Sequence, residues 1–218
     1  MRASLDTNVI IHFYKADLQE ILFNFFDEGV FIYEQIRKVE LNNHGKEILE
    51  QVDKDIKLGK IEVYTDQRLK DLAVYKIFEN NVKENRNLYQ AGDLGEVYAI
   101  SLAQTLGAYS LVTDDTKQGG PYMSLLNFED EVMPFTFADV LILRYLFGLV
   151  DENQTVSDFD MINTASELNW TFRSQLTKFI KRFWNDPHRQ EDVVWMQKLV
   201  SEKEIKVKSK IQALRKML

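Results

Sequence analysis

The sequence predicts an α/β domain with a short parallel sheet, followed by an all-helical C-terminal domain. Short apolar runs alternate with amphipathic stretches up to about residue 150, which is typical of parallel strands joined by right-handed helical crossovers. No strand pattern follows residue 150. We therefore expect an α/β domain over residues 1–150 and a helical domain over residues 151–218, two domains that a chain of 218 residues can form.

Five short apolar runs are the predicted strands. Each is bounded by acids, glycines or amphipathic stretches, as expected for strands that end at turns or helices. The runs are Arg2–Leu5, Val30–Tyr33, Ile61–Tyr64, Ser110–Thr113 and Val132–Phe137.

Apolar residues at helical spacing predict the helices between these strands. Asp17 is the expected cap of the first helix, and Gly59 the residue that ends the third. Asp93, with Glu96 three residues later, predicts a capping box at the start of a helix that runs to Gly107. The other expected helical segments are Leu18–Phe26, a helix from about Gln35, Ile48–Leu58, Asp66–Phe78 and Ala138–Leu149.

The C-terminal region predicts a polar linker and then helices. Asp151–Asp158 is the expected linker. The helices predicted after it are Met161–Trp170, Phe172–Phe183 and Val193–Leu218. Pro187 separates the last two, since proline cannot continue a helix interior. The aromatic residues of this region recur at helical spacing, which favours a buried core over a base-stacking surface.

The composition excludes several classes of site. The chain has no cysteine, which removes disulfides, thiolate metal sites and cysteine nucleophiles. No histidine has a His or Cys partner at metal-ligand spacing, so a zinc site is not expected. The N-terminus carries charges too early for a signal peptide, and the longest apolar run is interrupted by Arg144. We therefore expect a soluble, cytoplasmic protein that has no membrane partner.

Charge is distributed unevenly along the chain. The net charge is −7, which by itself argues against a nucleic-acid partner. Residues 1–150 carry 15 Lys and Arg against 24 Asp and Glu, whereas residues 171–218 carry 12 against 5. A cationic tail on an acidic body suits a polyanion held near an acidic site, although a solvated helix surface explains the tail equally well.

Acidic residues beside the apolar runs are the main candidates for a functional site. Asp6 and the pair Asp114–Asp115 each end a predicted strand, Glu40 follows the second strand, and Glu96 opens a helix. Because parallel strands end at one edge of the sheet, we expect these acids to gather there. Clustered carboxylates repel one another unless a cation lies between them, and oxygen ligands suit Mg²⁺ or Mn²⁺. Metal-assisted phosphodiester hydrolysis is the matching chemistry.

Each acid also has a purely structural explanation. Asp6 could cap a helix, Glu40 could be ion-paired on a helix surface, and Glu96 could complete the capping box. Glu34 competes with Glu40, because it lies closer to the strand end. The shared position at one predicted sheet edge is what favours function.

The order and local strings of these acids resemble the PIN domain family of metal-dependent ribonucleases. The matching strings are Leu5–Ile11, Val39–Leu41, Gly95–Ala103 and Leu111–Asp115. The resemblance covers about residues 1–150 and implies a three-layer α/β/α fold. The family often has Asp where Glu96 stands, and some relatives have an Arg after the fourth acid, where Lys117 is the nearest base here. The helical tail matches nothing in the family.

The resemblance implies a Mg²⁺- or Mn²⁺-dependent endoribonuclease that cleaves RNA with a metal-activated water. Asp6, Glu40, Glu96 and Asp115 take the catalytic positions, and Asp6, Glu96, Asp114 and Asp115 the metal positions. RNA is then the substrate, and a homodimer is left open. Two alternatives stay open as well: a non-catalytic PIN-like binding module, and a toxin held by an antitoxin partner.

Overall fold

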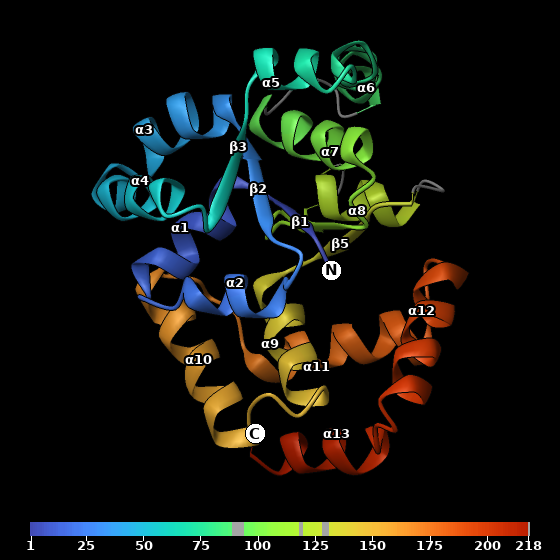
Figure 1. The fold of residues 1–218 in the computed structure, drawn as a ribbon. Coiled ribbons are helices and arrows are strands. Elements are labelled where there is room, and N and C mark those ends of the chain that lie inside the picture. Colours follow the sequence, from blue (N-terminus) through green and yellow to red (C-terminus); the bar gives the residue numbers. More distant parts are fainter. Residues whose placement is uncertain (89–93, 118–119, 128–130, 218) are drawn as a thin grey trace. The chain divides into compact units, whose positions relative to one another are not determined.

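The computed structural model describes residues 1–88, 94–117, 120–127 and 131–217. They form two compact units, Met1–Phe135 and Thr136–Leu218 (Figure 1). Helix α9 (Phe137–Leu146), which the sequence places in the first domain, belongs to the second unit, where it packs against other helices. The two units therefore meet at residues 135–136, before the boundary that the sequence predicts at residue 150.

The first unit is built on a parallel sheet of five strands in the order β3-β2-β1-β4-β5. The strands are β1 (Ala3–Leu5), β2 (Val30–Tyr33), β3 (Ile61–Tyr64), β4 (Ser110–Val112) and β5 (Met133–Phe135). This confirms the predicted α/β class with a short parallel sheet. Strand β1 is central and pairs with β2 on one side and β4 on the other. Residues that follow β1 and β4 therefore lie at the same edge of the sheet.

Helix α7 (Leu94–Leu106) packs against β1, β2 and β4 (Figure 1). Its buried residues surround the helix rather than forming one stripe, which is typical of a helix covered on all sides. The Ser4 hydroxyl donates a hydrogen bond to the Ala99 carbonyl at 2.9 Å, so the helix is tied to the central strand by a buried polar contact as well as by packing.

The remaining helical segments of this unit connect the strands. They are α1 (Thr7–Lys15), α2 (Glu20–Phe25), the π-helical turn η1 (Ile36–Glu40), α3 (Leu41–His44), the 3₁₀ turn η2 (Lys46–Ile48), α4 (Leu49–Lys57), α5 (Asp66–Asp71), α6 (Tyr75–Leu88) and α8 (Pro121–Asn127).

Three local features differ from the helices that the sequence predicts. Helix α1 is not among them; it begins directly after β1 with Asp6 as its cap, which is the structural explanation that the sequence left open for Asp6. Asp17 does not cap a helix, because its backbone has a positive φ of 56°. A positive φ of 59° at Ala73 likewise divides the predicted helix Asp66–Phe78 into α5 and α6. No glycine marks either break in the sequence.

The second unit consists of helices in the part of the chain that the structure describes. They are α9, α10 (Glu152–Ala165), α11 (Phe172–Ile180), the π-helical turn η3 (Lys181–Asn185), α12 (Gln190–Glu202) and α13 (Val207–Lys216). Phe159, Phe179 and Phe183 are fully buried, which agrees with the predicted aromatic core. No helix among the described residues is long and apolar enough to cross a membrane.

Three predictions for this region are wrong. The expected helix Met161–Trp170 is only the last part of α10, which ends at Ala165. The expected linker Asp151–Asp158 is helical, because the Asp151 side chain accepts a hydrogen bond from the Gln154 amide at 2.8 Å and so starts α10. The expected helix Val193–Leu218 is two helices, and a positive φ of 50° at Glu204 lies at the break between them.

A buried ion-pair network holds the second unit together. Arg182 Nε lies 2.6 Å from Asp192 Oδ2, and both side chains are almost completely buried. Asp139 on α9 lies 3.7 Å from Arg182, and Arg189 lies 3.7 Å from Asp192. Two cations and two carboxylates thus offset one another inside the unit, where an unpaired charge is costly.

Asp192→Ala should lower the free energy of unfolding by about 3–5 kcal/mol, because it leaves Arg182 buried without its main counter-ion. Glu202→Ala on the same helix is the control, since its ion pair with Lys198 is exposed and worth at most about 1 kcal/mol. All three tryptophans lie in this unit, so urea unfolding followed by tryptophan fluorescence measures the difference. Equal midpoints for the two variants would show that the network contributes nothing.

Candidate functional site

Asp6 and Thr113 meet where β1 and β4 end. The Asp6 amide donates to the Val112 carbonyl at 3.0 Å, which extends the strand pairing by one step. The Thr113 hydroxyl donates to Asp6 Oδ2 at 3.0 Å, and the Thr7 amide donates to Asp6 Oδ1 at 2.7 Å. Asp6 is 2 % exposed. Its carboxylate is therefore fixed by two donors inside the sheet edge.

The same threonine links Asp6 to Asp115. The Asp115 amide donates to Thr113 Oγ1 at 3.3 Å, so this hydroxyl both donates to Asp6 and accepts from Asp115. The Asp115 side chain is in turn hydrogen-bonded to the Glu96 carboxyl group, and Glu96 is 8 % exposed in the first turn of α7. The structure thus brings Asp6, Glu96 and Asp115 into one hydrogen-bonded chain.

The start of α7 also bears on the predicted capping box. Asp93, the expected cap, lies outside the described residues. The hydrogen bond from Glu96 to Asp115 shows that the Glu96 side chain reaches β4, whatever its relation to the helix start.

Gly120 leaves the space that Asp115 occupies. A Cβ atom at Gly120 would lie 2.7 Å from Asp115 Oδ1 and 3.0 Å from its Cγ. The Gly120 amide donates to the Lys117 carbonyl at 3.0 Å, which closes the loop after β4. Any side chain at position 120 would therefore force Asp115 to move.

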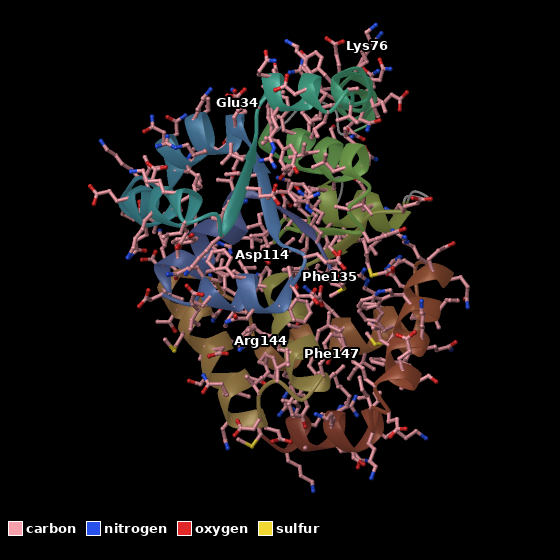
Figure 2. All side chains as sticks on the ribbon, viewed as in Figure 1. Glu34, Lys76, Asp114, Phe135, Arg144 and Phe147 are labelled. Carbon is pink, nitrogen blue, oxygen red and sulfur yellow. The ribbon has the colours of Figure 1, made fainter. Side chains whose placement is uncertain are left out.

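Asp114 takes a different partner from Asp115. Its Oδ2 lies 2.7 Å from Nδ1 of His12 on α1, and its side chain is 3 % exposed (Figure 2). His12 is not among the residues that the sequence predicts for the site. An aspartate next to a histidine can orient the imidazole ring, and a protonated His12 would neutralise Asp114. The pairing depends on the helix that follows Asp6, because this helix carries His12 back toward Asp114.

Glu40 lies at the end of the π-helical turn η1, which packs against α7. Its carboxylate is 4.0 Å from Nε2 of His44, a partner on the next helical turn. Glu34 is the acid that directly follows β2, and its Oε1 accepts from the Asp66 amide at 3.4 Å. π-Helical turns are rare in proteins, and those that occur often lie at functional sites. The turn is therefore the structural reason to keep Glu40 as a candidate.

Lys117 stabilises the negatively charged form of Asp115. Its ammonium Nζ lies 2.5 Å from Asp115 Oδ2, and its amide donates to Oδ1 at 3.1 Å. Burial by itself would raise the pKa of Asp115, but the hydrogen bond with Glu96 and the bonds and charge of Lys117 outweigh it. The pKa of Asp115 is therefore lowered below its ordinary value. The Lys117 side chain is 71 % exposed, so it can leave Asp115 at little cost.

The acids fit a hard divalent cation in ligand type, since Asp6, Glu96 and Asp115 offer only oxygen atoms. Within the described residues, however, no group of three or more His, Asp or Glu side chains is arranged to hold a metal ion. Protein donors already contact these acids: Thr7 and Thr113 donate to Asp6, and Lys117 is paired with Asp115. Lys117 places a single positive charge where a metal cation would place two.

No protein-family model, curated protein or solved structure matches this chain. The geometry of the sheet edge therefore carries the functional conclusion.

Lys117→Gln should raise the pKa of Asp115, because the cation that favours the carboxylate is lost. A lowered pKa stabilises the fold above the ordinary Asp value of about 3.8, and this stabilisation is lost as pH falls through the lowered pKa. The variant should lose it at a higher pH than the wild type. A carbon NMR titration of the Asp115 carboxyl group measures the change.

Lys76→Gln is the matched control, because Lys76 is exposed on α6 and projects outward (Figure 2). Its substitution should leave the Asp115 titration unchanged. The same Asp115 curve in wild type and Lys117→Gln would refute the role assigned to Lys117.

Proposed function

We propose that this chain is a PIN-like, metal-dependent endoribonuclease that hydrolyses RNA phosphodiester bonds. The observation that carries the proposal is the hydrogen-bonded chain from Asp6 through Thr113 to Asp115 and Glu96. These residues come from β1, β4 and α7, and they meet at the edge where ligand sites form in parallel sheets. Acids that follow neighbouring strands in this order are also what the resemblance to PIN domains implies.

The residues of the site would divide the work between them. Asp6, Glu96 and Asp115 would hold Mg²⁺ or Mn²⁺, and Asp114 and Glu40 would complete the site or orient a water molecule. When bound, the cation would act as a Lewis acid on the phosphodiester and supply a nucleophilic water. Thr113 fixes the direction of the Asp6 carboxylate.

Lys117 would have to exchange partners for this to happen. Its ammonium neutralises Asp115 in the structure, and its exposure leaves it free to move to a phosphate group of the RNA. The ammonium group of Lys117 would then keep a negative partner, because a phosphate group of the substrate would replace the carboxylate of Asp115.

One observation favours the alternative of a non-catalytic PIN-like binding module. The acids have protein donors, and no group of three within the described ranges is arranged for a metal ion. In such a module the hydrogen-bonded acids would serve only to fix the sheet edge. A test of metal binding therefore distinguishes the endoribonuclease from the binding module. A toxin partnered by an antitoxin would bind metal as the endoribonuclease does.

The double variant Asp6→Asn, Asp115→Asn tests the proposal. Mn²⁺ at about a hundredfold excess over its Kd should stabilise the wild type by about 2.7 kcal/mol, which is roughly 5–10 °C in Tm. The double variant should lose this shift and lower the cleavage rate of a fluorogenic RNA by roughly 10²-fold or more. Asparagine can still cap α1, so the fold should persist.

Asp160→Asn is the control, since this exposed aspartate lies on α10 in the second unit. It should behave like the wild type in both measurements. A wild type that shows neither a Mn²⁺-dependent Tm shift nor cleavage would favour the binding module. A shift that survives in the double variant would show that the metal binds elsewhere.

Gly120→Ala should impair cleavage with little loss of stability. The added Cβ would displace Asp115, and a shift of about 1 Å at a catalytic group can cost roughly 10²-fold in rate. Gly59→Ala is the opposite case. The added Cβ would meet no atom within 4 Å, but Gly59 has a positive φ of 74°, which strains any other residue. That variant should lower Tm and leave cleavage intact. Full activity in Gly120→Ala would show that the position of Asp115 does not matter.

A further inference from the structure

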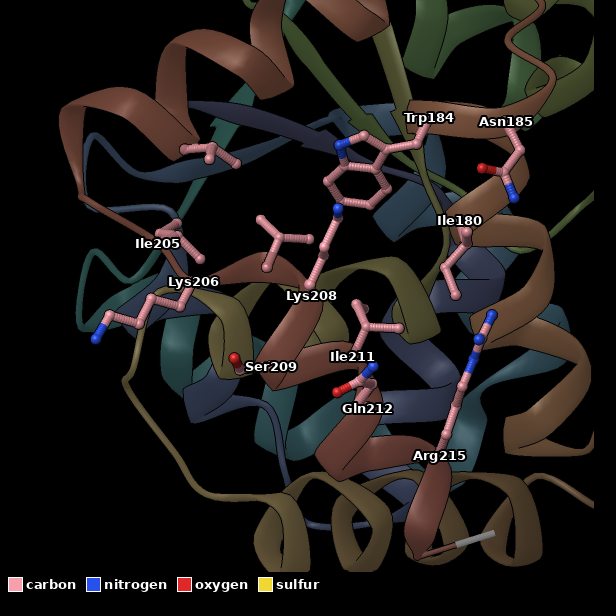
Figure 3. A pocket seen from close by; sticks show the side chains of 12 residues that line it. Ile180, Trp184, Asn185, Ile205, Lys206, Lys208, Ser209, Ile211, Gln212 and Arg215 are labelled. Carbon is pink, nitrogen blue, oxygen red and sulfur yellow. The ribbon is translucent and has the colours of Figure 1, made fainter.

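A groove in the second unit has a lining unlike the rest of the surface (Figure 3). It has a volume of about 680 Å³ and lies between the end of α11 with η3 and the helices α12 and α13. This size is within the range of about 300–1,000 Å³ that holds small ligands. Its residues all belong to one unit, so the groove is complete within that unit.

The floor of the groove is apolar and incompletely covered. Trp184, Ile180, Val200 and Ile205 are half-buried, and only Ile211 beneath them is buried. The Trp184 ring packs against Phe179 and Phe183, with centroids 5.9 and 6.1 Å away. The indole is therefore held in place from within the unit, and a ligand would meet a fixed aromatic surface.

The rim of the groove is cationic. Lys206, Lys208 and Arg215 line it, and no acidic residue does. Within the described part of the chain these three side chains form no ion pair, although the protein as a whole carries a net charge of −7. By contrast, nearby Lys198 pairs with Glu202, and Lys210 donates to the Tyr145 carbonyl. Positive charge without a counter-ion thus gathers at this apolar groove.

Three neutral polar side chains complete the lining. They are the amides of Asn185 and Gln212 and the hydroxyl of Ser209 (Figure 3). Amides donate and accept hydrogen bonds together, which matches the mixed donor and acceptor edge of a nucleobase. A helical acidic peptide would use the apolar floor and the cations, but its backbone groups are paired within the helix and offer the two amides few partners.

We propose that this groove binds a nucleotide segment of single-stranded RNA. A base would stack on Trp184 and the aliphatic floor, the amides would contact its edge, and Lys206, Lys208 and Arg215 would neutralise the flanking phosphates. The choice of RNA rests on the proposed function, because a ribonuclease with an acidic body needs cationic surface elsewhere to hold its substrate. The groove itself is independent of the sheet-edge acids.

Fluorescence anisotropy of a labelled, single-stranded oligoribonucleotide of eight nucleotides tests the proposal on the full chain. Excess EDTA keeps the RNA intact and removes any dependence on metal. Lys208→Glu should weaken binding at least tenfold and lower the salt dependence of log K by about one unit or more. Lys216→Glu makes the same charge change on the same helix outside the groove, and it should weaken binding less than threefold.

Two further variants guard against a change that merely disturbs the fold. Arg215→Glu should reproduce the effect of Lys208→Glu. Trp184→Phe should remove most of the tryptophan quenching that the oligonucleotide causes, which Trp170 and Trp195 outside the groove would not replace. Circular dichroism should show the same Tm for the lysine variants as for the wild type.

Three results would overturn the proposal. The first is no binding by the wild type. The second is equal weakening by Lys208→Glu and Lys216→Glu, which would indicate diffuse electrostatic attraction. The third is Lys208-dependent binding of a Leu- and Glu-rich helical peptide with no binding of RNA, which would make the groove a peptide site.

The sheet-edge variant Asp6→Asn, Asp115→Asn separates this inference from the proposed function. Adding Lys208→Glu to it should weaken oligonucleotide binding by the same factor as Lys208→Glu weakens binding in the wild type. Groove-dependent binding without Mn²⁺-dependent cleavage would defeat the nuclease proposal alone. RNA cleavage by a chain whose RNA affinity does not change with the groove substitutions would refute this inference alone.

Discussion

The candidate site depends on the parallel pairing of β1 with β4. That pairing sets Leu5 opposite Val112, so the next residues, Asp6 and Thr113, arrive together although they are 107 positions apart in the chain. The Ser4 hydroxyl ties the same strand to α7 and so helps to bring Glu96 to this edge. The contact of Thr113 with Asp6 follows directly from this pairing, because both side chains are short and reach only a neighbouring strand end.

Much of the fold could be predicted because the strands are marked on both sides. Acids or glycines bound the apolar runs, and the acids that end them, such as Asp6 and Asp115, reach the site through strand geometry alone. Helix α1 could not be predicted in this way, since its residues from Val9 to Phe13 are nearly all apolar and show no period that separates helix from strand. His12 was hidden with it, because its contact with Asp114 exists only once that helix is recognised.

The two units handle charge in opposite ways. In the first, the acids of the sheet edge are matched by protein donors, including Thr113, His12 and Lys117. In the second, Arg182 and Asp192 are matched inside, whereas the cations around the Trp184 groove are not. The break between α12 and α13, which no glycine or proline announces, places those cations beside the apolar floor. Sequence periodicity alone runs through this break, so the groove could not be foreseen.

The π-helical turn at Ile36–Glu40 sets the direction in which Glu40 points. A π-turn holds more residues than an α-turn, so each of its residues advances the direction of the side chain by less than the about 100° of an α-helix. If the same residues formed ordinary α-turns, Glu40 would point away from its present direction relative to the strand before it. The type of one helical turn thus decides where one acid points, while every strand of the sheet keeps its place.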